Sequence, residues 1–247
     1  MHQFFVDSSQ IGKEYVTITG GDVNHIRNVL RMKKGEKIRV SNQEGVDYFC
    51  KIAEIGETFV QADIVSKDEK GTELPAKIYL FQALPKGDRM ETVIEKAVEL
   101  GVYEIIPVAM KYCVVKLDEK KAAVKVKKWQ LKAETAAKQS KRSIIPKVHD
   151  VVTYKEALKL ANACDIRFVP YENEDGMLST KKALEAVEPG KTISIIIGPE
   201  GGFAEEEIAA ARETMQSVSL GKRILRTDTA GICMMSMLML QLELAQL

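Results

Sequence analysis

The sequence predicts an α/β protein, in which a parallel sheet covered by helices follows a small β-barrel-like module. Three observations lead to this fold class. The chain has 247 residues, which exceeds one average domain. Its first 70 residues alternate short strand-like runs with turns. Later strand patterns are almost entirely apolar and alternate with helical patterns, as in a parallel sheet that is buried on both faces.

The predicted N-terminal module consists of strands, one hairpin and one helix. "YVTITGGD" alternates apolar and polar residues before a Gly-Gly break, and "FVQADIV" has the same period. "EKIRVSNQEGVDYFCKI" resembles a hairpin that turns between Asn42 and Gly45. Between these strands, "DVNHIRNVLRMKKG" has helical spacing and ends at Gly35. The polar stretch 66–77 is the predicted linker.

After the linker, the pattern is that of a parallel α/β domain. The helix "DRMETVIEKAVELG" places its apolar residues on one face, and a long basic helix is expected from about Asp118 to Ser140. A closing helix is expected from Thr229 onwards. The predicted strands are "KIYLFQAL", "EIIPVAM", "DIRFVPYE", "TISIIIG" and "QSVSLG", with helices between the last three.

Composition excludes several classes of protein. The 36 Lys and Arg residues nearly balance the 35 Asp and Glu residues. Four cysteines without paired spacing and three distant histidines argue against a zinc site, so we expect no metal and reduced thiols. We expect no signal peptide. The most apolar segment, 231–240, is shorter than the roughly 20 residues of a membrane span, so we expect a cytoplasmic protein.

Positive charge is concentrated in the segment 111–147. Twelve Lys or Arg residues against three Asp or Glu residues leave a local excess of +9. On a helix, Lys121, Lys125, Lys128 and Lys132 form one stripe, beside an apolar stripe that contains Trp129. A solvated amphipathic helix explains most stripes of this kind. However, a one-sided local excess is also typical of surfaces that contact nucleic-acid phosphates, and we favour that interpretation.

The loop "IIIGPEGGFAEEE", residues 195–207, is a candidate ligand loop. It lacks the glycine spacing of dinucleotide loops and the terminal Gly-Lys of phosphate loops. Three glutamates, at 205–207, would occupy the helix turn that otherwise attracts phosphate. A ligand with little negative charge therefore fits better. A tight turn alone would need one glycine rather than three.

A second glycine loop, "SLGKRILRTDTAG", covers residues 219–231. It leaves a predicted strand at Gly221 and carries Arg223 and Arg226, which suit a polar or anionic substrate. Thr227 or Asp228 could cap the following helix.

The two loops together resemble the paired signature of SPOUT-class RNA methyltransferases. The sequence is most similar to the family that methylates N3 of a uridine in 16S ribosomal RNA of the small subunit. Further matching segments are "HIRNVLRMKKGEKI", "LPKGDRMETVIEKAVELGVYEIIPV" and "KKWQLKAETAAKQSKRSIIPKV", in order along nearly the whole chain.

The resemblance implies a PUA-like RNA-binding domain at 1–71 and a SPOUT methyltransferase domain at 72–247, with a trefoil knot at roughly 165–247. It implies a homodimer with the last helix in the interface, where several methionines fit an adaptable surface. It also implies S-adenosyl-L-methionine as the cofactor, held between the loop after "RFVPYE" and the two glycine loops. A sulfonium cation without phosphate agrees with the acidic turn at 205–207.

The candidate site residues, from the charge pattern, the expected chemistry and the resemblance together, fall into three sets. The cofactor-binding set is Tyr171, Glu172, Gly198, Pro199, Glu200, Gly201, Gly202, Leu220, Gly221, Ile224, Leu225, Thr229 and Ala230. The catalytic set is Arg223, Arg226, Glu200 and Asp228. The RNA-binding set is Arg27, Arg31, Lys86, Arg89, Lys125, Lys128, Lys132 and Arg142.

Three positions depart from the family pattern. Ala204 replaces the usual helix-capping Ser or Thr, so Glu207 is expected to lose its capping-box partner. Asp228 replaces a Glu. Tyr112 stands where an Arg is usual, beside Lys111, which could partly substitute for it.

The expected chemistry requires removal of the weakly acidic N3 proton of uridine. The two arginines, 223 and 226, are candidates to position phosphate or stabilise the uracil anion. Glu200 and Asp228 are the candidate carboxylates, as base or as arginine partners, and the general base stays open. The alternatives are a SPOUT enzyme that acts on tRNA or on a ribose hydroxyl, and a non-catalytic RNA-binding protein.

Overall fold

The computed structural model describes residues 1–69, 71–172 and 176–246, and it divides into two compact units. The first unit comprises Met1–Glu73 together with Ala137–Ile145. The second unit comprises Leu74–Ala136 and Pro146–Leu247. None of the helices in the described part of the chain combines the length and hydropathy that a membrane span requires.

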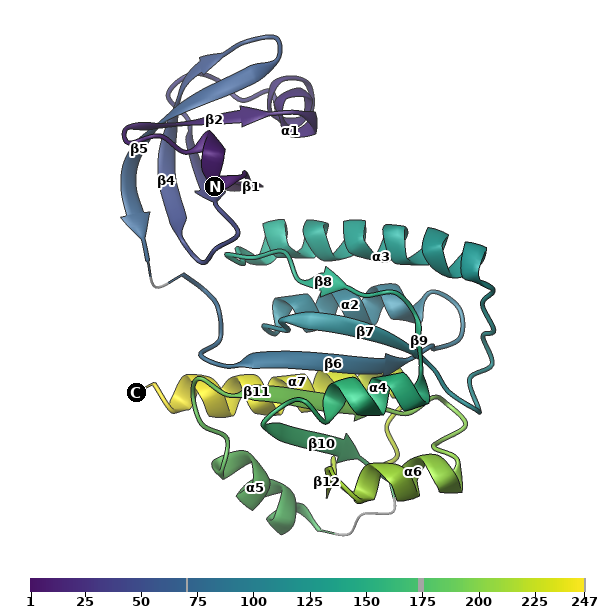
Figure 1. The fold of residues 1–247 in the computed structure, drawn as a ribbon. Helices are drawn as coiled ribbons and strands as arrows, with labels where there is room; N and C mark the ends of the chain where they lie inside the picture. The colour runs from purple at the N-terminus through teal and green to yellow at the C-terminus, as the bar shows by residue number, and fades with distance from the viewer. Residues whose placement is uncertain (70, 173–175, 247) are drawn as a thin grey trace. The chain divides into compact units, whose positions relative to one another are not determined.

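The first unit is built on a curled five-stranded sheet (Figure 1). Its strands, in the order β1-β3-β4-β5-β2, are β1 (His2–Phe5), β3 (Lys37–Ser41), β4 (Asp47–Ile55), β5 (Phe59–Asp68) and β2 (Tyr15–Thr19). β1 runs parallel to β3 and the other pairs are antiparallel, including the predicted β3–β4 hairpin. The two end strands do not pair with each other in the described residues, so the sheet is open rather than a closed barrel.

The helical segment of this unit is shorter than predicted. α1 (Gly21–Asn24) continues as a π-helical turn η2 (His25–Val29) and ends there, not at Gly35. Ile26 is buried, whereas Val29 is exposed, and Arg31 has φ +52°. A non-glycine residue in the left-handed region ends a helix. A short 3-10 turn, η1 (Ser8–Gln10), was not predicted.

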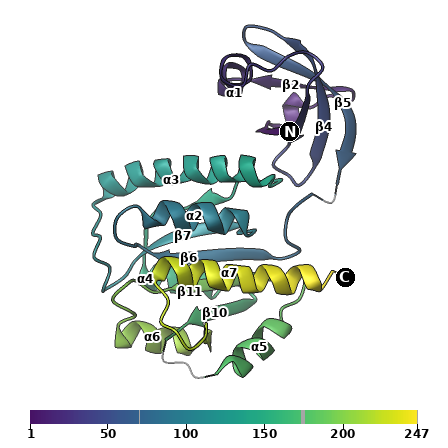
Figure 2. The ribbon, with the colours of Figure 1, turned by 180° about the vertical axis from the view of Figure 1, so that it is seen from behind.

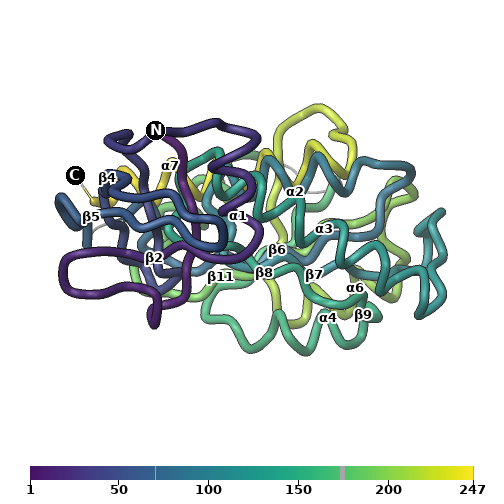
Figure 3. The backbone as a smooth tube through the Cα atoms, turned by 90° about the horizontal axis from the view of Figure 1, so that it is seen from above, coloured from purple at the N-terminus to yellow at the C-terminus, as the bar shows by residue number. Residues whose placement is uncertain are grey.

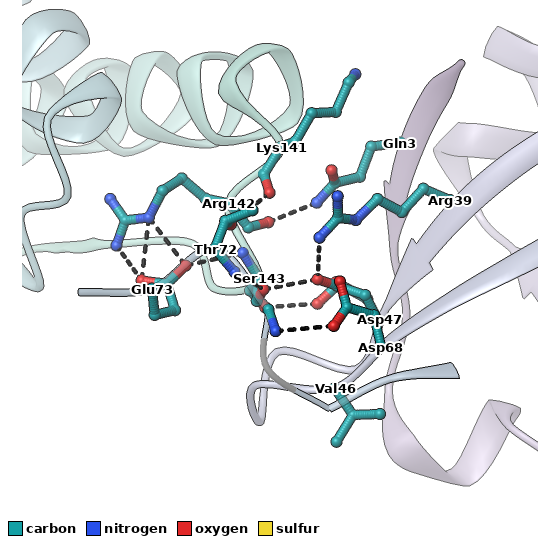
Figure 4. Close-up of polar contacts among 12 residues, drawn as sticks. Gln3, Arg39, Val46, Asp47, Asp68, Thr72, Glu73, Lys141, Arg142 and Ser143 are labelled. Atoms are coloured by element: carbon teal, nitrogen blue, oxygen red, sulfur yellow. Dashed lines mark hydrogen bonds and ion pairs between the residues drawn. The ribbon is translucent and has the colours of Figure 1, made fainter. Parts of the chain in front are cut away.

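Segment 137–145 joins the first unit through a buried polar cluster (Figure 4). Arg39 pairs with Asp47, which also accepts a hydrogen bond from the Ser143 hydroxyl at 2.7 Å. Arg142 is 3% exposed and forms a two-pronged ion pair with Glu73. The predicted linker is shorter than expected, because residues 66–68 complete strand β5.

The second unit is a parallel sheet with helices on both faces, as predicted. The strands follow the order β12-β10-β11-β6-β7-β8, and β9 pairs with β7. They are β12 (Gln216–Val218), β10 (Ile166–Pro170), β11 (Thr192–Ile197), β6 (Lys77–Ala83), β7 (Glu104–Ala109), β8 (Lys147–Val148) and β9 (Val152–Thr153). The two-residue strands β8 and β9 were not predicted.

Helices α2 (Arg89–Glu99) and α7 (Thr227–Leu244) lie on one face of this sheet, and α4 (Tyr154–Ala161) lies on the other (Figures 2 and 3). The remaining helices are α3 (Glu119–Ser140), α5 (Met177–Glu185) and α6 (Glu205–Arg212). α2 buries the five apolar side chains that its spacing predicted, Met90, Val93, Ile94, Ala97 and Val98. α7 starts two residues earlier than predicted.

Candidate active site

A cavity of about 370 Å³ opens where the neighbouring strands β10 and β11 end. The carboxyl edge of a parallel sheet is a common place for ligands. Both glycine loops contribute to its walls, as does Arg89. The lining residues are Arg89, Pro170, Tyr171, Glu172, Ile197, Gly198, Pro199, Glu200, Gly202, Phe203, Leu220, Gly221, Lys222, Arg223, Ile224, Leu225, Arg226, Thr227 and Ala230.

This cavity contains most of the predicted cofactor-binding set. Of that set, Gly201 and Thr229 do not line it. Of the predicted catalytic set, Asp228 does not line it. The loop after "RFVPYE" falls on residues 173–175, which lie outside the described residues. In the part of the chain that the structure describes, no three His, Cys, Asp or Glu side chains gather as metal ligands.

Each glycine of the loop 198–203 has a local structural reason. A Cβ atom on Gly198 would lie 2.9 Å from the Phe203 ring, and one on Gly201 would lie 2.9 Å from the Cβ of Tyr112. Gly202 has φ +75°. The turn conformation itself therefore needs one glycine, as expected, and close packing against Phe203 and Tyr112 accounts for the other two.

Aromatic side chains form one wall of the cavity. The rings of Tyr171 and Phe203 meet edge to face, with 6.4 Å between their centroids. The Arg212 guanidinium lies 4.9 Å from the centroid of Tyr171. This wall presents a π-surface on which a flat heterocycle could stack.

Thr227 does not cap helix α7. Its hydroxyl donates to the Gly198 carbonyl at 2.6 Å and accepts a hydrogen bond from the Gln82 amide at 2.9 Å. Asp228 does not cap α7 either, because no side-chain cap bond exists at this terminus and Arg226 is the N-cap residue. The Asp228 Oδ1 atom is buried without a hydrogen-bond partner among the described residues.

Glu200 is engaged by two donors from the segment at the start of α2. Its Oε1 atom accepts the Lys86 backbone N–H at 2.9 Å and lies 3.4 Å from an Arg89 guanidinium nitrogen. This geometry ties the first glycine loop to α2.

Arg223 and Arg226 are exposed at the cavity and form no ion pair with any described residue. Lys222 is exposed beside them. The cavity mouth therefore carries unneutralised positive charge, which an anionic or electron-rich substrate would complement.

The acidic turn 205–207 keeps half of a capping box despite Ala204. The buried Glu207 accepts the Ala204 backbone N–H at 2.9 Å through Oε2 and the Lys111 backbone N–H at 2.9 Å through Oε1. Glu207 is therefore partnered, contrary to expectation, and only the Ser or Thr half of the box is absent. Lys111 forms an ion pair with Glu206 at 2.6 Å, a hydrogen bond that raises the Lys111 pKa and lowers the Glu206 pKa.

The predicted RNA-binding residues divide into accessible and engaged ones. Lys128 pairs with Glu91 at 2.6 Å and Lys132 pairs with Glu95, so much of the α3 stripe faces carboxylates of α2. Arg142 is buried against Glu73, and this corrects its assignment to an RNA-contacting surface. Arg27, Arg31 and Lys125 have no ion-pair partner among the described residues.

Sequence reasoning missed Gln82, which is fully buried beneath the cavity loops. The only signal was an amide in the otherwise apolar strand pattern "KIYLFQAL". A polar side chain in a strand that is buried on both faces needs a hydrogen-bond partner inside the protein.

The chain matches two family models. Residues 72–239 match the RNA methyltransferase domain, and residues 18–65 match the RNA methyltransferase PUA domain.

Curated relatives and solved structures agree with these matches. The chain is 36% identical to the ribosomal RNA small subunit methyltransferase E of Bacillus subtilis, over 99% of this chain and 98% of the relative. It is 34% identical to the protein of the same name from Mesomycoplasma hyopneumoniae, over 96% and 98%. The crystal structure of the Neisseria gonorrhoeae enzyme of that name, bound to S-adenosyl methionine, superposes with a TM-score of 0.81 at 31% identity, over 96% and 95% of the two chains. The chain therefore belongs to the ribosomal RNA small subunit methyltransferase E family of RNA methyltransferases.

Proposed function

We propose that this protein transfers a methyl group from S-adenosyl-L-methionine to N3 of a uridine in 16S ribosomal RNA of the small subunit. The observation that carries the proposal is the cavity between the two glycine loops, in a chain whose Neisseria relative is bound to S-adenosyl methionine. The cofactor supplies an electrophilic methyl group on a sulfonium cation.

The residues at the cavity fit such a cofactor. Gly198, Leu220 and Leu225 line the cavity, and we assign their backbone groups to contacts with the adenosine. The aromatic pair Tyr171 and Phe203 offers a stacking surface. The acidic turn 205–207 begins α6 directly after the loop and disfavours phosphate at that helix terminus, although its glutamates do not line the cavity. Gly201 and Thr229 do not line the cavity. We assign Gly201 to the shape of the loop and Thr229 to the start of helix α7.

The two unpaired arginines support a role in catalysis. Deprotonated uracil spreads its charge over N3 and two carbonyl oxygens, and guanidinium groups match such an anion with paired donors. Arg223 and Arg226 would stabilise this anion or fix the flanking phosphate. Glu200 holds Arg89 and the Lys86 N–H, so we assign it a positioning role, and the general base stays unassigned.

The accessible cations of the first unit support RNA contact. Arg27 and Arg31 lie in one short exposed segment with Lys33 and Lys34, and none of these side chains is paired within the described residues. Phosphate contacts of this kind position an RNA without reading its sequence. Lys86, Arg89 and Lys125 would extend such contact in the second unit.

We also propose a homodimer, a trefoil knot at roughly 165–247 and domain limits at 1–71 and 72–247. The family matches at 18–65 and 72–239 support these limits. α7 supports the dimer, because it buries Met234, Met235 and Leu238 on one side. Its other side bears a second apolar stripe at offsets 0, 4, 7 and 11, formed by Cys233, Met237, Leu240 and Leu244. Leu240 and Leu244 are 57% and 55% exposed, as expected of a face that a second copy covers.

The test is methyl transfer from labelled S-adenosyl-L-methionine to small ribosomal subunits that lack the modification, followed by mapping of the labelled nucleotide. We expect label at N3 of one uridine in 16S RNA. Label only in tRNA or on a ribose would contradict the proposal, and failure to bind the cofactor in a calorimetric titration would favour a non-catalytic RNA-binding protein.

A further inference from the structure

Gln82 occupies an unusual position in the second unit. It lies near the carboxyl end of β6, is fully buried, and pairs in register with Ile197, the residue that precedes the Gly198 loop. Strands of this kind are apolar in sequence because both faces are covered. A buried amide costs free energy when its hydrogen bonds are not all made. The Oε1 atom of Gln82 has no hydrogen-bond partner among the described residues.

The donor end of this amide points to the start of α7. Gln82 Nε2 donates to the Thr227 hydroxyl at 2.9 Å and to the Ala83 carbonyl at 3.3 Å. Because the Ala83 carbonyl can only accept, the amide nitrogen rather than the amide oxygen of Gln82 must face Ala83 and Thr227. Thr227 can then use its single proton only in the bond to the Gly198 carbonyl, at 2.6 Å.

The helix leaves room for this arrangement. A Cβ atom on Gly231 would lie 2.9 Å from Gln82 Oε1. Gly231 is one turn after Thr227 on α7 and is itself buried. Helix α7 therefore supplies both the Thr227 hydroxyl that accepts the hydrogen bond from Gln82 and, at Gly231, the space that the Gln82 amide occupies.

We propose that Gln82 and Thr227 are positioning residues, which act as one relay from β6 through α7 to the Gly198 carbonyl and hold the two glycine loops in register for the cofactor. The inference rests on the proposed function, because it assigns these residues to the binding of S-adenosyl-L-methionine. Thr227 and Gly198 both line the cavity, so a shift of either one changes its shape. Neither residue touches the reacting atoms in this proposal.

A stabilising role alone would not require this chemistry. An apolar side chain of similar volume at position 82 would fill the core without an unpaired oxygen, and replacing both polar partners by apolar groups is often nearly neutral for stability. The polar relay fixes the direction of the Gly198 carbonyl, which apolar packing does not do. The two roles are therefore separable by experiment.

The test compares Thr227→Val with Thr227→Ser in the full-length protein. Valine keeps the shape but removes the hydroxyl, whereas serine keeps the hydroxyl. We expect the dissociation constant for S-adenosyl-L-methionine, measured by calorimetry, to rise about tenfold in Thr227→Val and to stay within about twofold of wild type in Thr227→Ser. Thermal unfolding without cofactor serves as the control for a purely structural effect.

Gln82→Leu, alone and combined with Thr227→Val, tests whether the two residues form one relay. If they do, the double variant binds the cofactor no more weakly than Thr227→Val alone. Additive losses, or a fall in melting temperature with an unchanged dissociation constant, would overturn the proposal. A wild-type protein that does not bind S-adenosyl-L-methionine would instead refute the proposed function, so the two failures are distinguishable.

Discussion

Arg226 is an exposed guanidinium at the mouth of the cavity with no carboxylate partner among the described residues. Its removal should leave the fold intact, because it forms no ion pair there. We expect Arg226→Ala to lower the rate of methyl transfer by about 100-fold or more, as loss of one donor to a developing anion does. Single-turnover assays on small subunits measure the rate, and thermal unfolding checks the fold.

Lys181→Ala is the matched control for loss of one positive charge. Lys181 is exposed and, among the residues that the structure describes, pairs with Glu185 on α5. We expect this variant to retain wild-type activity. Near-normal transfer by Arg226→Ala would remove Arg226 from the active site.

A substitution at Glu200 tests whether this residue is the general base or a positioning residue. One of its oxygens accepts two donors, from Lys86 and Arg89, and an amide oxygen can accept the same bonds. We therefore expect Glu200→Gln to keep transfer within about tenfold of wild type and to leave the pH–rate profile unchanged. Loss of the acidic limb of that profile, with a far larger fall in rate, would identify Glu200 as the general base.

The sequence allowed both glycine loops to be predicted, but not the bonds between them. Residue type and local spacing signal a loop that follows a buried strand. The bonds that orient the site join residues far apart in the chain: Gln82 to Thr227 spans 145 positions and Lys86 to Glu200 spans 114. No local pattern encodes such partners, so the sequence offers Thr227 only as one of two candidate helix caps and does not single out Gln82.

The C-terminus of helix α3 is strained by a non-glycine residue in the left-handed conformation. The helix ends at Ser140, and Lys141 follows with φ +64°. This left-handed position usually holds glycine. We expect Lys141→Gly to raise the free energy of unfolding by about 1 kcal/mol, as measured by urea denaturation.

Ser140→Gly is the control for this prediction. Ser140 still belongs to the helix, where glycine is unfavourable by up to about 1 kcal/mol. The two neighbouring substitutions should therefore act in opposite directions. Destabilisation by both variants would show that contacts of the Lys141 side chain outweigh its backbone strain.

The lysines of α3 should contribute differently to RNA binding from Arg27 in η2 and Arg31 just after it. Lys128 and Lys132 already face carboxylates, whereas Arg27 and Arg31 are unpaired within the described residues. We expect the double variant Arg27→Ala, Arg31→Ala to bind RNA more weakly. The slope of the logarithm of its binding constant against the logarithm of salt concentration should become shallower, by the amount that corresponds to about one to two lost phosphate contacts. Filter-binding titrations at several salt concentrations provide the measurement.

The paired variant Lys128→Ala with Lys132→Ala is the comparison, since it removes the same charge. We expect it to change the salt dependence less than the arginine pair does. An equal or larger change would show that Lys128 and Lys132 break their ion pairs with Glu91 and Glu95 in order to contact RNA.

Element prediction succeeded where periodic segments were long, as in α2, α3, β6 and β11. It failed where tertiary contacts decide the structure. β8 and β9 have two residues each and exist through pairing with β7. The helical segment after Gly20 ends at Val29 rather than at Gly35, because Arg31 turns the backbone into the left-handed region just after the last apolar residues of the pattern, Val29 and Leu30.

The two compact units of the protein are not two continuous stretches of chain. Segment 137–145 is bonded into the first unit by Ser143 to Asp47 and by Arg142 to Glu73, across 96 and 69 positions. Gly71 is required there as well, because a Cβ atom would lie 2.6 Å from the Ser143 hydroxyl. Composition along the chain predicts a linker, but it does not reveal that a later segment returns to the first unit.

Alkaline pH should destabilise the folded protein through one buried and two partly buried acidic groups. Burial raises the pKa of the Cys50 thiol to about 12, with a contribution from the charge of Asp63. Burial likewise raises the pKa of Tyr79 to about 12, and it raises that of Tyr154. An unfolded thiol titrates near pH 8.5. Above that pH the unfolded chain releases a proton that the folded chain retains, so the free energy of unfolding falls as pH rises.

For Cys50, the stabilisation is fully present below about pH 8.5 and is lost as pH rises towards the folded value, by up to about 1.4 kcal/mol per pH unit. We expect Cys50→Ala to be less stable than wild type near neutral pH, because it leaves a small cavity. Its disadvantage should shrink between pH 8.5 and 10, since it lacks the titrating thiol. Urea unfolding of both proteins at several pH values measures this difference, and a constant offset across the range would mean that the Cys50 thiol has the same pKa in the folded and unfolded chains.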